Sequence, residues 1–104
     1  MDQNYPKEKR SEVVTILDIR QQNLENSLDL SDFISLERLD CSNNRLTSLN
    51  LSNCFRLEKV YCYDNLLINL TLPTNSVNLK ELFLNNNNFS LNTYRLWRCH
   101  SLFF

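Results

Sequence analysis

The sequence predicts a repeat solenoid that is mostly β, with one parallel sheet of about four short strands and little α-helix. The first observation is a recurring skeleton, L-x-x-L-x-C-x-x-N-x-L at Leu36, with related segments starting at Val14, Leu57 and Leu79, so that the steps are 22, 21 and 22 residues. The second is composition, because the 104 residues include 20 Leu and 16 Asn but no Gly. Without Gly, we expect Asn to occupy the turn positions with positive φ.

The four segments can be compared directly along the chain. They read VTILDIRQQNL, LERLDCSNNRL, LEKVYCYDNLL and LKELFLNNNNF. This pattern resembles the leucine-rich-repeat family, whose signature is L-x-x-L-x-L-x-x-N/C-x-L, and the resemblance covers about residues 13–92. It implies a right-handed coil in which each L-x-L segment is a strand of a parallel, concave sheet. The short unit resembles the class of 21–22 residues found in bacterial and some fungal proteins.

Alternate residues of each expected strand point to opposite sides, so one set is predicted to form the core. The inward columns are Val14, Leu36, Leu57, Leu79; Leu17, Leu39, Val60, Leu82; Ile19, Cys41, Cys62, Leu84; and Leu24, Leu46, Leu67, Phe89. Stacking of neighbouring units buries these side chains, and each one fully buried stabilises the fold by roughly 1.5–3 kcal/mol.

The second half of each unit is predicted to return in an extended conformation. Apolar and polar residues alternate over 28–31, 49–52 and 70–73, and Pro73 is compatible with an extended return but not with a helix. The corner that follows is expected to be filled by apolar side chains. These are Phe33, Ile34, Cys54, Phe55 and Val77.

A column of amide side chains follows the strands, at Gln22, Asn44, Asn65 and Asn87. Turn backbone that is buried needs hydrogen-bond partners, and an amide can both donate and accept. We therefore predict a ladder that joins successive turns. Gln22 departs from the family's Asn and carries its amide on a longer arm, so the resemblance does not specify the geometry of the first turn.

The ends of the chain lack the repeat. Residues 1–12 are polar and are expected to be a tail or a partial cap, and residues 93–104 are an aromatic tail or a partial cap over the last coil. A truncated array is the other interpretation of the second end. An open C-terminal coil would then allow end-to-end self-association.

Charge and hydropathy exclude several partners. The net charge is −1, from 11 basic and 12 acidic residues, so we expect neither nucleic acid nor an anionic membrane as a partner. No run of apolar residues is long enough to span a bilayer. The charged opening residues do not resemble a signal peptide, which predicts a cytoplasmic protein, unless the chain is a piece of a longer one.

Little in the sequence points to catalysis, and we predict no catalytic residue, no metal site and no cofactor. Cys41, Cys54, Cys62 and Cys99 show no C-x-x-C spacing. Cys41 and Cys62 share one slot of the repeat, which favours buried hydrophobes over ligands or nucleophiles. The Cys99–His100 pair lacks an orienting third group, so a surface His near the chain end is the favoured interpretation. Without Gly there is no phosphate-binding loop.

Binding is better supported, because the outward residues of the predicted strands can be aligned in rows. The rows are Ile16, Arg38, Lys59, Glu81; Asp18, Asp40, Tyr61, Phe83; Arg20, Ser42, Tyr63, Asn85; and, at the rim, Gln21, Asn43, Asp64, Asn86. From these we predict a binding site on the concave face. Its residues are Arg38, Asp40, Lys59, Tyr61, Tyr63, Asp64, Glu81, Phe83 and Asn85.

The predicted function is a non-enzymatic module that binds a protein or peptide ligand through this face. Exposed aromatic residues beside Arg are enriched in interface hot spots. Stacking of these rings for the stability of a small sheet is the competing interpretation. The alternative function is a recognition fragment of a larger leucine-rich-repeat protein that also carries a catalytic domain.

Overall fold

The computed structural model describes residues 10–74, 76–91 and 93. A short 3-10 turn, η2 (Arg10–Glu12), precedes seven strands. The strands are β1 (Ile16–Asp18), β2 (Glu25–Asp29), β3 (Arg38–Asp40), β4 (Arg45–Asn50), β5 (Lys59–Tyr61), β6 (Asn69–Thr71) and β7 (Glu81–Phe83). Within these residues, no helix is both long enough and apolar enough to cross a membrane.

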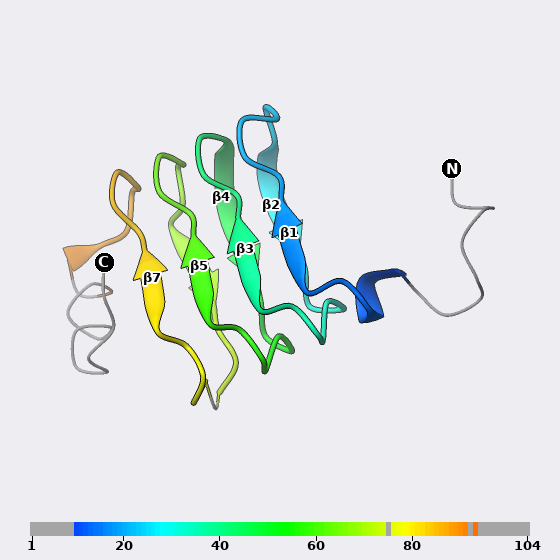
Figure 1. Ribbon diagram of the computed structural model, residues 1–104. Helices are drawn as coiled ribbons and strands as arrows, with labels where there is room; N and C mark the ends of the chain where they lie inside the picture. Colours follow the sequence, from blue (N-terminus) through cyan, green and yellow to red (C-terminus); the bar gives the residue numbers. More distant parts are fainter. Residues whose placement is uncertain (1–9, 75, 92, 94–104) are drawn as a thin grey trace.

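The strands form two sheets on opposite sides of a flat coil (Figure 1). The front sheet has the order β1-β3-β5-β7 and the return sheet has the order β2-β4-β6. Every pairing is parallel, so the chain is a parallel β-solenoid, and the predicted fold class is confirmed. The return limbs are extended as predicted.

The register of the front sheet follows the sequence repeat. Leu17, Leu39, Val60 and Leu82 are aligned on successive strands, each one repeat apart. Leu39, Val60 and Leu82 are completely buried, and they lie in one continuous core with the apolar residues of the return limbs. Leu17 is only partly buried, because no strand of the described residues pairs with β1 on its other side.

The predicted amide ladder is present from Asn44 onward. The Asn44 Oδ1 atom accepts hydrogen bonds from the backbone N–H groups of Gln22 and Leu24, both at 3.0 Å. Its Nδ2 group donates to the carbonyl oxygen of Ile19 at 3.0 Å and to that of Cys41 at 2.9 Å. Asn65 and Asn87 make equivalent bonds one and two coils further on, whereas the side chain of Gln22 is exposed.

Each coil leaves the front sheet through one residue with positive φ. These residues are Gln21, Asn43, Asp64 and Asn86, with φ between 55 and 59°. Asn23 and Asn26 also have positive φ. Asn therefore substitutes for Gly at four of the six positions, and the expectation that Asn would fill them is wrong at Gln21 and Asp64.

Two sequence-based placements are wrong. Among the corner residues, Cys54 is buried and Phe33 partly buried, but Ile34, Phe55 and Val77 are exposed, the last by 78%. Ser42, which the repeat aligns with the outward residues, is completely buried. Strand β3 ends at Asp40, so the strict alternation of a strand no longer applies two residues later.

Candidate binding face

The outward residues of the front sheet form two adjoining rows. Arg38 pairs with Lys59 and Lys59 with Glu81, so these side chains make the first row, which begins at Ile16. The second row runs from Asp18 and Asp40 to Tyr61 and Phe83. The structure thus brings together the six predicted site residues that lie on strands. The other three, Tyr63, Asp64 and Asn85, follow the ends of β5 and β7.

The aromatic part of the face is a stacked pair. The rings of Tyr61 and Phe83 have centroids 5.3 Å apart and are inclined by only 8°. The Tyr61 hydroxyl donates a hydrogen bond to Glu81 Oε1 at 2.8 Å. That bond raises the pKa of Tyr61, as does desolvation, while the nearby Arg38 acts in the opposite direction. Tyr61 therefore stays a neutral phenol, with its ring held beside Phe83.

In the acidic part of the face, one arginine pairs with two carboxylates. The Arg20 guanidinium lies 3.2 Å from Asp18 Oδ2 and 3.8 Å from Asp40 Oδ2. Asp40 Oδ1 also accepts hydrogen bonds from the backbone N–H of Ser42 at 3.1 Å and from its hydroxyl at 2.6 Å. Exposed ion pairs of this kind contribute only about 0–1 kcal/mol, so their main effect is to fix the orientation of the carboxylates.

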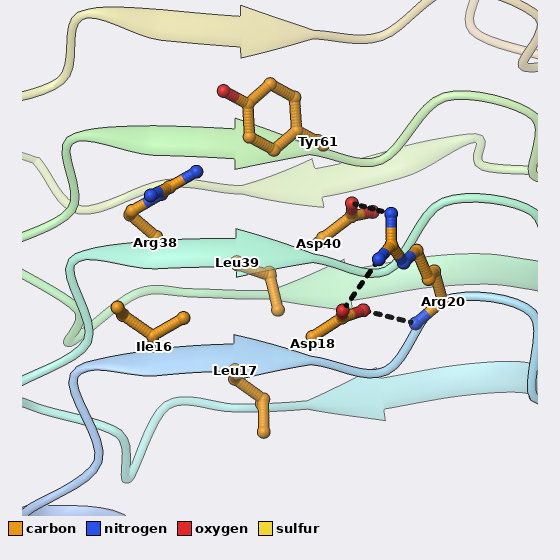
Figure 2. A pocket seen from close by; sticks show the side chains of 8 residues that line it. All are labelled: Ile16, Leu17, Asp18, Arg20, Arg38, Leu39, Asp40 and Tyr61. Atoms are coloured by element: carbon orange, nitrogen blue, oxygen red, sulfur yellow. Dashed lines mark hydrogen bonds and ion pairs between the residues drawn. The ribbon is translucent and has the colours of Figure 1, made fainter.

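Between these parts lies an open hollow of about 200 Å³ across β1, β3 and β5. Its lining residues are Ile16, Leu17, Asp18, Arg20, Arg38, Leu39, Asp40 and Tyr61. Figure 2 shows that Ile16 and Arg38 lie toward the beginning of the strands, while Asp18, Asp40 and Arg20 lie toward their ends. The Tyr61 hydroxyl points toward the Arg38 end.

The predicted site did not include the first coil, although the hollow depends on it. Ile16, Asp18 and Arg20 line the hollow and are absent from the predicted set of site residues. A signal for them is present in the sequence, because each occupies the same row as a predicted site residue of a later repeat. At the rim, the Asn86 amide donates to Asp64 Oδ1 at 2.7 Å, and Asn85 is exposed.

The cysteines belong to the core. Cys41, Cys54 and Cys62 are buried and free, as the shared repeat slot of Cys41 and Cys62 predicted. Burial raises the pKa of Cys41 to about 12 and that of Cys54 to about 11, and it raises the pKa of Cys62 strongly as well. A thiolate nucleophile is therefore disfavoured at all three positions.

Two further questions of chemistry concern a metal site and the Cys99–His100 pair. Within residues 10–74, 76–91 and 93, no group of three or more His, Cys, Asp or Glu side chains is arranged to hold a metal ion. Cys99 and His100 lie outside the described residues, as do most of the predicted N-terminal and C-terminal caps.

Comparisons with protein-family models, with curated proteins and with solved structures found no match to this chain. The geometry of the front sheet is therefore the basis on which a function can be argued.

Proposed function

We propose that this chain is a protein- or peptide-binding module of the leucine-rich-repeat type, without enzymatic activity, and that it binds through the outward face of the front sheet. The skeleton L-x-x-L-x-C-x-x-N-x-L supports the repeat type, because its apolar positions are the core columns and its Asn forms the ladder. The observation that carries the binding proposal is the open hollow bordered by Tyr61, with Ile16 61% exposed at its edge.

The exposed apolar groups of this face are suited to a ligand. Ile16 and the partly exposed Tyr61 and Phe83 interrupt rows that are otherwise charged. Aromatic side chains bury a large area with little loss of side-chain entropy, so they contribute strongly when a partner covers them. The Tyr61–Phe83 stack fixes both rings before any ligand arrives, which lowers the entropic cost of binding.

The size of the face favours a peptide or a single loop over a broad protein surface. Four strands spaced about 4.8 Å apart span roughly 14 Å between the outer two backbones. A typical stable protein interface covers about 800 Å² on each partner. The affinity expected for so narrow a face is modest, on the order of micromolar.

Selection from a random peptide library tests this proposal, because it requires no assumption about the ligand. Linear peptides displayed on phage are selected on the immobilised full chain, and enriched peptides are titrated against purified variants. Tyr61→Ala is expected to weaken binding by roughly tenfold or more. Phe55→Ala is the matched control, because Phe55 is an exposed aromatic residue in the corner after β4, and it is expected to leave binding unchanged.

Two results would contradict the proposal. One is the absence of any enriched peptide over repeated selections on the folded chain. The other is a set of enriched peptides that bind Tyr61→Ala as tightly as the unaltered chain, since the stacked ring would then contribute nothing to the binding surface.

A further inference from the structure

The front sheet contains two pairs of like charges in register, and within the described part of the chain only one of them has a counterion. Asp18 lies opposite Asp40 on the neighbouring strand, and Arg38 lies opposite Lys59. Like charges directly opposite each other destabilise a sheet by up to about 1 kcal/mol. The two pairs occupy adjoining rows but are compensated very differently.

The acidic pair is compensated by the protein itself. Arg20 forms ion pairs with both carboxylates, at 3.2 Å and 3.8 Å, and Ser42 donates two hydrogen bonds to Asp40. This half of the hollow therefore has its two carboxylates partly compensated by one guanidinium, with one negative charge in excess, before any ligand binds.

The basic pair lacks such compensation. Among the described residues, no carboxylate lies within ion-pair distance of Arg38 or Lys59. Glu81 is in register with Lys59, but its Oε1 atom accepts the hydrogen bond from Tyr61. Arg38 and Tyr61 both line the hollow, and the Tyr61 hydroxyl, a neutral group, points toward the Arg38 end (Figure 2).

We propose that the Arg38–Lys59 pair receives an acidic side chain, Asp or Glu, of a bound peptide, while an adjacent apolar side chain of that peptide enters the hollow between Ile16 and Tyr61. This inference rests on the proposed function and specifies the chemistry of the ligand. Arg38 lines the hollow toward the beginning of the strands, in register with Ile16, so a carboxylate held there is adjacent to the apolar surface of Ile16 (Figure 2).

The surrounding charges favour a single carboxylate over a phosphate or a polyanion. Asp18 and Asp40 lie about 7 Å further along the strands, and Glu81 is in the same row as Lys59. A doubly charged phosphate would be repelled more strongly by these carboxylates than a single carboxylate. A C-terminal carboxylate is usually held by a nest of backbone N–H groups, whereas the cations here are side chains on an open sheet, so we assign the acidic side chain.

The test compares parallel selections of the same phage library on three full-length proteins. They are the unaltered chain, the variant Arg38→Gln/Lys59→Gln, and the control Arg45→Gln/Arg56→Gln. The control removes the same net charge from exposed positions in β4 and in the corner after it. Peptides with Asp or Glu next to an apolar residue are expected to be enriched on the unaltered chain and on the control, but not on Arg38→Gln/Lys59→Gln.

Synthetic versions of the enriched peptides then measure the effect of the charge. Replacing their acidic residue by its amide is expected to weaken binding at least about tenfold, since a charge-assisted hydrogen bond is lost. The same loss is expected for the unmodified peptide on Arg38→Gln. Amidation of the peptide's C-terminus is expected to change nothing, and higher salt to weaken binding.

A structural role for the cations predicts a different result. If Arg38 stabilised the folded state, Arg38→Gln would lower the denaturant concentration at the midpoint of unfolding. We expect the midpoint to be unchanged or raised, because the substitution relieves the repulsion from Lys59.

The failures of the two proposals are distinguishable. Enriched peptides that lack acidic residues yet need Tyr61 would overturn the acidic-ligand inference and leave the binding face intact. Peptides that lose affinity on C-terminal amidation would also overturn it, in favour of a terminal carboxylate. Failure of all three proteins to enrich any peptide would overturn both proposals.

Discussion

At the scale of single residues, the most consequential side chains are the buried amides at the end of the front strands. Asn65 Oδ1 accepts a hydrogen bond from the Leu46 backbone, and its Nδ2 group donates to the carbonyl oxygens of Cys41, Cys62 and Tyr63. One side chain thus bonds to backbone groups in two coils, just past the ends of the front strands. A residue without an amide leaves the buried Leu46 N–H without this partner, whereas each of the three carbonyl oxygens keeps one other donor, from Asn44, Asn87 and the Asn43 backbone.

Asn65→Ala is therefore expected to lower the free energy of unfolding by about 2 kcal/mol, since the buried Leu46 N–H loses its partner and three carbonyl oxygens each lose one of two donors. Denaturant unfolding followed by circular dichroism measures this loss. The control is Asn53→Ala, an exposed position for which a change within about 0.5 kcal/mol is expected. A loss below about 1 kcal/mol for Asn65→Ala would contradict the role of the ladder.

The buried thiols predict a pH dependence of stability. Burial raises the pKa of Cys41 to about 12 from an ordinary value of 9.0, and it raises that of Cys62 as well. Above pH 9 the unfolded chain loses these protons while the folded chain keeps them. The stabilisation is therefore complete below about pH 9 and is lost as the pH rises toward the folded pKa, by up to about 1.4 kcal/mol per pH unit for each thiol.

The measurement is the free energy of unfolding between about pH 8 and 11 for the unaltered chain and for Cys41→Ala/Cys62→Ala. Lys and Tyr titrate in both proteins, so the difference between the two isolates the thiols. We expect the variant to show the shallower decline. Parallel curves would show that these thiols do not titrate differently in the folded and unfolded states.

At the scale of the elements, each strand of the front sheet depends on its neighbours. The strands have only three residues each, too few to be stable alone, and the burial of one strand depends on the coils beside it. Leu39 in β3 is covered from both sides and is completely buried, whereas Leu17 in the edge strand β1 is partly exposed.

This difference in burial predicts that the same substitution lowers the free energy of unfolding by different amounts at the two positions. Leu39→Ala is expected to lower the free energy of unfolding by about 4 kcal/mol, within the range for fully buried leucines, and Leu17→Ala by about half as much. Urea titration of both variants under the same conditions gives the comparison. Equal losses would mean that β1 is covered as completely as β3.

The strands also show which structural features could be predicted from the sequence alone. The repeat period predicted the coils, the inward columns and the register from Leu39 to Val60. Units of equal length that stack in a parallel sheet place the same repeat position of each unit side by side. It failed at Ser42, which lies past the end of β3, where the direction of a side chain depends on the turn and on the hydrogen bond to Asp40. The hollow could not be predicted either, because it depends on how far each outward side chain extends from the sheet.

At the scale of the whole molecule, the core residues determine the fold, and the outward residues of the front sheet determine what it can bind. The core columns repeat from coil to coil, so they specify the solenoid but no partner. The outward rows change at every coil, from Ile16 to Arg38, Lys59 and Glu81. The proposed function rests on these changes, and the open surface around Tyr61 and Arg38 is where we expect a ligand to be recognised.

The most direct test of the binding face is an NMR titration of the isotopically labelled full chain with a peptide enriched by phage selection. We expect the largest shift changes at the backbone amides of β1, β3 and β5 and at the Tyr61 ring, with the amides of β2, β4 and β6 nearly unchanged. Shift changes centred on the return sheet, while the amides of Arg38 and Tyr61 stay in place, would contradict the assignment of the front sheet as the binding surface.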